Sequence, residues 1–336
     1  MTENNLLKFS SSPHVKSPRT TKWIMINVCI ALLPACIAGC VFFSWKALLV
    51  LVLSLVSAVA SELVYQLIAK KTFKQFLKEF DFTSCVTGLL VGMCMGSQTP
   101  WYAPVLASAF AIIVVKMLFG GTGRNLVNPA ITGRIFAFIS FTSVMDRGWI
   151  APTISGLFGG SSLNPTTGPT VLKNLFDTKL GGMPTLSNLD LFLGTGVAGC
   201  IGETCKLALI LGGLYLAILG IINIGYPIIY IVVTGVFTVL LKGFNFEYFL
   251  PSILSGGLFL GAIFMATDYV TTPNTTLGNV IYFIALGLLT AGLRVATEIE
   301  VVSFAILLMN LIVPLIDKFV MTKPFGFKKK KEAKNG

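Results

Sequence analysis

Long apolar runs recur along the chain and are separated by short segments rich in polar residues, glycine and proline. Runs of about 17 or more residues are long enough to cross a bilayer as a helix. Backbone polar groups find no water in the hydrocarbon core, so we expect each run to be helical. The pattern predicts ten spans, at residues 23–44, 47–69, 82–98, 101–119, 131–145, 204–224, 226–241, 249–266, 277–294 and 300–317. The sequence therefore predicts an all-α polytopic membrane protein.

Composition agrees with this fold class, because 54% of the residues are hydrophobic and only 12% are charged. Soluble domains carry about twice that charged fraction. Two stretches are less clear than the rest. Residues 131–145 are short for a span, and residues 190–203 are compatible with a surface helix or a re-entrant helix.

The distribution of Lys and Arg predicts the orientation, since cytoplasmic loops carry an excess of both. If the N-terminus is cytoplasmic, 17 of the 25 basic residues fall on that side and six on the other. Lys116 and Lys206 fall inside spans. This bias places both termini, residues 1–22 and 318–336, in the cytoplasm and the long loop 146–189 on the outer face. The basic ending FKKKKEAK favours contact with lipid headgroups, and binding to nucleic acid is the alternative that we rank below it.

Two similar motifs suggest an internal repeat. GLLVG at 88–92 and GLFLG at 257–261 lie in the third and eighth predicted spans, and each leads into a polar exit that contains proline. With five spans in each half, residues 23–145 and 190–317 would have opposite orientations in the membrane, an arrangement common in transport proteins. The alternative is a chance similarity between two helices rich in Gly and Leu.

Charged residues inside or beside spans are expensive and commonly mark a pathway or a pair. Glu62, Glu203 and Asp317 are the candidates for an ion path. The alternative for Lys116, Lys206 and Asp317 is an interfacial or snorkelling position. Glu203 and Lys206 are also spaced to pair on one face of a helix.

The loop GGTGRNLVNPAITGR, residues 120–134, combines glycines with two asparagines. Glycines allow a backbone to turn tightly near a ligand, although an ordinary turn explains the same residues. The chain has one histidine, His14, and seven cysteines without a C-x-x-C pair. We therefore predict no catalytic residue of its own and no metal site.

Several segments together resemble the RnfD/NqrB family, and its RnfD branch in particular. They are SPHVKSPRTTKWIM, GGTGRNLVNPAITGR, GETCKLALILGG, FMATDYVTTP and LIVPLID, which occur in order between about residues 12 and 320. Members of this family are membrane flavoprotein subunits of ion-translocating oxidoreductase complexes. The resemblance implies the same class of function for this chain.

The resemblance also implies two flavins. FMN would be joined through its phosphate to Thr170, in a motif similar to D-x-x-S-G-A-T, by a separate flavin transferase. Here the segment reads NPTTGPT, so Thr167 and Gly168 match, whereas Asn164 and Pro169 depart from the family pattern. A second, non-covalent flavin, riboflavin, would bind at Asn125, Asn128 and Asp268.

The implied assembly is an Rnf complex in the bacterial inner membrane, with partner subunits A, B, C, E and G. Ferredoxin and NAD would react only through partner subunits, and the free energy would drive Na⁺ or H⁺ outward. A secondary transporter or channel of inverted-repeat type, without flavin, would show the same hydropathy. Bound flavin is the property that separates these two interpretations.

Overall fold

A computed structural model describes residues 19–70, 72–147, 172, 175, 187–194 and 197–321. Every regular element in this part of the chain is a helix. The predicted fold class, an all-α polytopic membrane protein, is therefore confirmed. Thr167, Gly168 and Thr170 lie outside the described residues, as do Asn164, Pro169 and most of both terminal tails.

The first half of the chain forms seven α-helices and one π-helical segment. They are α1 (Thr21–Phe43), α2 (Trp45–Ile68), α3 (Phe73–Glu79), α4 (Thr83–Met93), α5 (Tyr102–Phe110), the π-helix η1 (Ala111–Met117), α6 (Pro129–Ser140) and α7 (Thr142–Arg147). Because η1 continues α5 directly, the two form one rod that coincides with the predicted span 101–119.

The described part of the second half contains the remaining helices. They are α9 (Asn188–Leu193), α10 (Lys206–Ile218), α11 (Gly225–Leu241), the short 3₁₀ turn η3 (Phe246–Tyr248), α12 (Phe249–Leu254), α13 (Leu258–Leu260), the π-helix η4 (Gly261–Met265), α14 (Thr276–Thr297) and α15 (Val302–Phe319). A helix is present within each of the ten predicted spans.

Helix length divides these elements into two groups. Four helices, α1, α2, α14 and α15, are long and apolar enough to cross a membrane on their own. The segments Phe246–Leu254 and Leu258–Met265 form a fifth candidate that is bent by 66° at a break. The other five predicted spans correspond to shorter apolar helices of 10 to 17 residues. The count of ten spans and the inverted repeat stay predictions.

The break after α4 corrects one predicted boundary. The apolar pattern extends this span to residue 98, but α4 ends at Met93. The carbonyls of Met93 and Met95 accept hydrogen bonds from the backbone of Gly202 and Ile201, at 2.8 and 3.0 Å. Backbone in a membrane can leave the helix only where protein groups satisfy it, and residues 197–205 supply those groups. These residues form a buried irregular segment rather than part of a helix.

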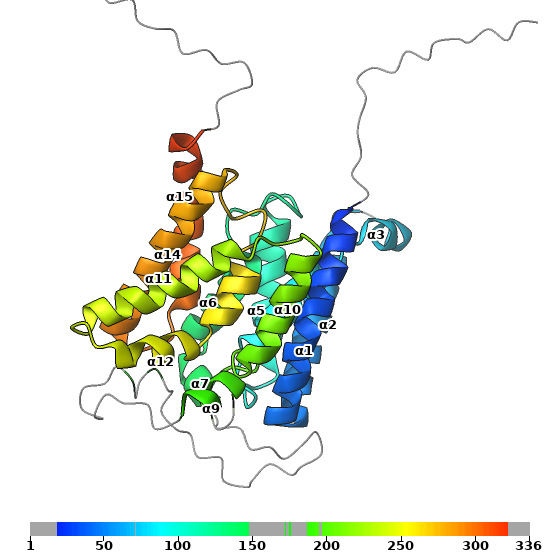
Figure 1. Cartoon of the computed structure of the whole chain (residues 1–336). Helices are drawn as coiled ribbons and strands as arrows, with labels where there is room; N and C mark the ends of the chain where they lie inside the picture. Colours follow the sequence, from blue (N-terminus) through cyan, green and yellow to red (C-terminus); the bar gives the residue numbers. More distant parts are fainter. Residues whose placement is uncertain are drawn as a thin grey trace, which may run out of the picture.

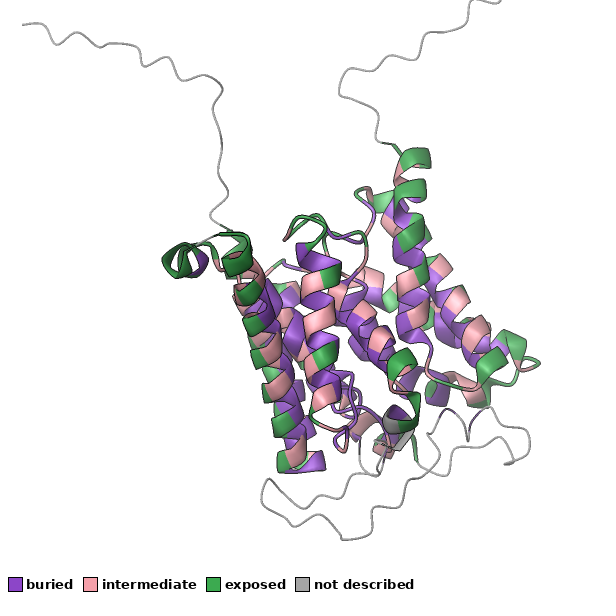
Figure 2. Cartoon of the chain, turned by 180° about the vertical axis from the view of Figure 1, so that it is seen from behind, coloured by how far each residue is buried: buried purple, intermediate pink, exposed green. Residues whose placement is uncertain are grey.

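Packing follows a related plan in the two halves. The second predicted span, α2, packs against α4 and α5, and the seventh, α11, packs against α12 and α14. Contacts between α1 and α10 and between α6 and α15 join the halves. In Figure 1 the start of α1 and the end of α15 lie at one end of the bundle, and α7 and α9 lie at the other. Exposed residues run along the outer faces of the long helices (Figure 2), and many of them are large and apolar, as expected for contact with lipid.

Candidate functional site

A cavity of about 110 Å³ lies where the two halves of the chain meet. Its walls come from α1, α4, η1, the 120–130 segment, the end of α10, η4 and the loop after η4. Asn125, Asn128 and Asp268 all line it, although 140 residues separate the last two. The structure therefore brings together the three positions that were predicted to bind a second flavin.

A second hollow of about 480 Å³ adjoins the cavity and shares Ile221, Ile222, Thr267 and Tyr269 with it. Cofactor pockets commonly measure about 300–1,000 Å³. The cavity alone is therefore small for a flavin, whereas the cavity and the adjoining hollow together have a volume in that range. Apolar residues form most of the cavity wall, and hydroxyl, amide, ammonium and carboxylate side chains line the rest. This combination suits a flat aromatic ring system with a polar edge.

Asn128 joins two of the segments that form the cavity wall. Its Oδ1 accepts a hydrogen bond from the backbone nitrogen of Ala130 at 3.0 Å, which caps the N-terminus of α6 ahead of Pro129. Its Nδ2 donates to the carbonyl oxygen of Met265 at 3.1 Å, at the end of η4. Asn128 thus joins the two halves, whereas the Nδ2 of Asn125 bonds locally to the carbonyl of Val127.

Asp268 lies in the loop that follows η4. Its Oδ2 accepts a hydrogen bond from Thr271 Oγ1 at 3.3 Å, and its backbone carbonyl accepts one from Thr272 Oγ1 at 2.9 Å. Burial raises the pKa of the Asp268 carboxyl, and hydrogen bonds from Val270 and Thr271 oppose this effect. A carboxyl of this kind can serve as acceptor or, when protonated, as donor toward a ligand.

Lys116 lies at the polar edge of the cavity and does not snorkel to a surface. Its side chain is only 3% exposed, and its Nζ forms an ion pair with Glu62 Oε1 at 3.2 Å. The same ammonium donates to Thr83 Oγ1, and Ser84 donates to the other Glu62 oxygen. The snorkelling alternative for Lys116 is therefore wrong, because α2 and α4 enclose the ammonium and supply its partners.

Asp81 connects this pair to the protein surface. It accepts hydrogen bonds from Thr83 Oγ1 and, at 2.6 Å, from the exposed Thr122. Burial by itself would raise the pKa of Asp81, but these hydroxyl donors and the Lys116 ammonium lower it below its ordinary value. The result is a continuous chain of polar groups from Thr122 to Glu62.

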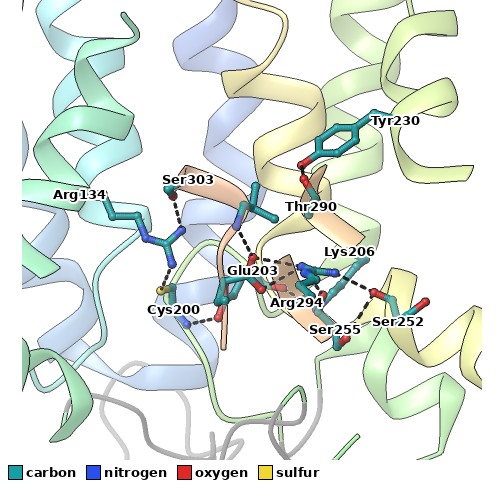
Figure 3. A network of polar contacts seen from close by, with 12 residues as sticks. Arg134, Cys200, Glu203, Lys206, Tyr230, Ser252, Ser255, Thr290, Arg294 and Ser303 are labelled. Carbon is teal, nitrogen blue, oxygen red and sulfur yellow. Dashed lines mark hydrogen bonds and ion pairs between the residues drawn. The ribbon is translucent and has the colours of Figure 1, made fainter. Parts of the chain in front are cut away.

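Glu203 belongs to a second buried network, shown in Figure 3. Its Oε1 accepts a hydrogen bond from the backbone nitrogen of Cys200 at 2.7 Å. Lys206 is fully buried and donates to the Glu203 backbone carbonyl at 2.7 Å, not to its carboxylate. Both alternatives for Lys206, a snorkelling residue and an i, i+3 ion pair, are therefore wrong, because its ammonium is satisfied by backbone carbonyls of the segment that enters α10.

Two arginines in Figure 3, Arg134 and Arg294, count among the basic residues assigned to the two membrane faces, but both are buried. Arg294 pairs with Glu300 at 2.9 Å and also donates to the carbonyls of Ser252 and Ser255, where α12 ends. Arg134 donates to Ser303 Oγ at 2.9 Å. Neither arginine therefore reports on orientation. Their position within otherwise apolar helical segments is the sequence feature that could have indicated burial.

Asp317, the third candidate for an ion path, accepts hydrogen bonds from the backbone and side chain of Asn274, at 3.0 and 2.8 Å. It thereby holds the loop before α14 against the end of α15. Among the described residues, the hydrogen bonds of Glu62, Glu203 and Asp317 do not join any two of them.

These features define a polytopic helical membrane protein with a cavity between its halves and with buried, paired charges. The chain belongs to the NQR2, RnfD, RnfE family, whose profile matches residues 8–326.

The relatives cover nearly the whole chain. It is 41% identical to the D subunit of the Na⁺-translocating ferredoxin:NAD⁺ oxidoreductase complex from Acetobacterium woodii, over 99% of this chain and 100% of the relative. It is 35% identical to the proton-translocating counterpart from Clostridium ljungdahlii, over 96% and 97% of the two chains. It is 33% identical to the D subunit of the ion-translocating oxidoreductase complex from Stutzerimonas stutzeri, over 90% and 91%.

Proposed function

We propose that this chain is the D subunit of an ion-translocating ferredoxin:NAD⁺ oxidoreductase complex. Relatives with that name match it from end to end. The structural observation that supports the proposal most directly is the convergence of Asn125, Asn128 and Asp268 on one cavity between the halves. In this proposal the chain acts with subunits A, B, C, E and G, and ferredoxin and NAD⁺ react at those partners.

The cavity and the hollow beside it would hold a non-covalent flavin, riboflavin. A bound flavin supplies one- and two-electron chemistry. Asn125 would meet its polar edge, Asp268 would accept or donate a hydrogen bond, and the apolar wall would exclude water from the ring. Asn128 would act mainly by holding α6 and η4 at the correct separation, because both ends of its amide bond to the protein.

The second flavin would be FMN, attached covalently at Thr170 by a flavin transferase, with Thr167 and Gly168 in the recognition segment. The support for this is the likeness of NPTTGPT to the family motif. The phosphoester link would tether the cofactor and leave its ring free to react.

We infer an inner-membrane location with both termini in the cytoplasm and Thr170 on the outer face. The Lys and Arg bias supports this orientation. It is also in keeping with Figure 1, where the start of α1 and the end of α15 lie opposite α7 and α9, the helices on either side of the long loop. The two flavins would then lie toward opposite faces of the membrane, as transmembrane electron transfer requires. The tails, and the basic C-terminus in particular, would contact lipid headgroups.

The transported ion would be Na⁺ or H⁺, since the relatives carry names with each. Glu62, Glu203 and Asp317 are the proposed acidic residues on the ion path. Glu62 has the strongest support, because its ion-pair partner Lys116 lines the cavity.

The first experiment expresses the chain with its flavin transferase and runs the purified protein on a denaturing gel. We expect ultraviolet fluorescence in the band, and a peptide containing Thr170 that is heavier by the mass of FMN less one water. Thr170→Val should abolish both signals, whereas Thr178→Val, in the same loop, should leave them unchanged.

A dark band with an unmodified peptide would show that Asn164 and Pro169 have disabled the motif. If the native protein also releases no flavin on acid treatment, the transporter or channel without flavin becomes the better interpretation.

A further inference from the structure

The ion pair of Lys116 and Glu62 is asymmetric with respect to the cavity. Lys116 lines the cavity, whereas Glu62 lies behind it and does not. The ammonium therefore stands between a buried carboxylate on one side and the space for a ligand on the other. A change of charge in that space would act on Lys116 first.

Both residues are enclosed, with side-chain exposures of 3% for Lys116 and 6% for Glu62. Charges so far from water interact strongly, because little solvent screens them. The charged and titratable groups that face this pair are Asp81, in the loop before α4, and Cys85 on α4. Removing Lys116 from Glu62 would leave a buried carboxylate without its counter-charge, a state that is stable only if a cation replaces it.

Lys116 lies on an irregular helical segment that borders the cavity. It lies in the π-helix η1, and a second π-helix, η4, contributes Ile263 and Phe264 to the cavity. Segments of π-helix occur frequently at functional sites. Lysine also reaches its partner through a flexible four-carbon stem, and its ammonium already divides its hydrogen bonds between Glu62 and Thr83.

A route for a replacing cation is also present. Oxygen atoms of Thr122, Asp81 and Thr83 lead from the surface to Lys116, with Thr122 Oγ1 2.6 Å from Asp81 and 3.3 Å from Thr83 Oγ1. Carboxylate and hydroxyl oxygens can relay a proton or coordinate Na⁺.

We propose that Lys116 couples the charge of the cavity ligand to cation uptake at Glu62. This inference rests on the proposed function, in which the ligand is a flavin and a reduced donor centre in a partner subunit supplies the electron. Each electron that enters without a proton adds one negative charge to the cavity. Lys116 then bonds toward that charge, and Glu62 takes up one H⁺ or Na⁺, so that charge is balanced. When an oxidised acceptor centre in a partner subunit takes the electron, Lys116 returns to Glu62 and the cation is released.

The test uses the full-length chain with Thr170→Val as the parent, so that only the non-covalent flavin contributes to the spectrum. The flavin is titrated reductively in detergent at several pH values, in NaCl and in KCl. In the parent, we expect the reduction potential to depend on pH or Na⁺ more steeply than in Glu62→Gln. Lys116→Met should favour the oxidised flavin about tenfold or more and lose the same cation dependence. Lys116→Arg, which keeps the charge, should stay close to the parent.

The double variant Glu62→Gln with Lys116→Met removes both charges and guards against a folding defect. If coupling runs through Lys116, it should match Lys116→Met in potential and in cation dependence. An unchanged potential and cation dependence in Lys116→Met, or in the double variant if the single one does not fold, would overturn the inference and leave the proposed function intact. A parent that binds no flavin would overturn the inference together with the proposed flavin site in the cavity, whereas the covalent FMN at Thr170 is tested separately by the fluorescent band.

Discussion

Charged residues are those whose observed positions differ most from the positions expected from the sequence. Arg294 counts among the basic residues assigned to the outer face, yet it is fully buried and pairs with Glu300. Lys116 is likewise enclosed and paired with Glu62. Removing one partner of a buried ion pair leaves an unpaired charge away from water, which costs much more free energy than the intact pair. Each pair therefore makes the protein sensitive to the loss of one member.

Arg294→Met should destabilise the protein by about 3–5 kcal/mol, because it leaves the buried Glu300 carboxylate without its counter-charge and removes the hydrogen bonds to the Ser252 and Ser255 carbonyls. This loss of stability is measured by heating the protein in detergent and determining, by size-exclusion chromatography, how much folded protein remains at each temperature. Adding Glu300→Gln should recover part of it, since the unpaired charge is gone. Equal melting temperatures for Arg294→Met and the unaltered chain would contradict the importance of this pair.

At the scale of elements, glycines set how closely helices approach. A Cβ atom at Gly88 of α4 would lie 2.9 Å from the backbone of Leu55 and Ser54 in α2. Gly261, in the other glycine motif, lies against Val302 at the start of α15. Both motifs therefore permit close contact with a neighbouring helix.

Gly88→Ala should destabilise the α2–α4 contact by about 1–3 kcal/mol, because backbone atoms cannot move aside for the added methyl group. Gly292→Ala is the matched control, since a Cβ there meets nothing within 4 Å in α14. That change should be neutral or stabilising by about 0.4–1 kcal/mol. The melting temperatures of both variants are measured in the same detergent and compared with that of the unaltered chain. Equal decreases in melting temperature would show that the close approach of α2 and α4 is not required.

At the scale of the whole molecule, the cavity exists only because the two halves pack together. Its walls combine α4, η1 and the start of α6 from the first half with η4 and the end of α10 from the second. None of the residues labelled in Figure 3 lines the cavity. A flavin in the cavity would therefore lie near the Lys116 network.

Membrane-impermeant thiol labelling of intact cells tests the proposed orientation. Phe246→Cys, at an exposed position (77%) between α11 and α12, should be labelled from outside. Leu126→Cys, which is 49% exposed beside the cavity, should react only after the cells are opened. The unaltered chain provides the background from its seven cysteines. The reverse pattern would place the termini on the outer face.

The sequence by itself determined the fold class and the position of most helices, because apolar length and the need to satisfy backbone groups act locally. It also indicated Asn125, Asn128 and Asp268, through the family resemblance, although no local rule places these residues together. Tertiary structure alone decided that α4 ends at Met93, since Gly202 and Ile201 supply its hydrogen bonds from over 100 residues away. It likewise decided the partners of Lys116, Lys206 and Arg294, because whether a charge faces lipid, water or another helix depends on packing between distant segments.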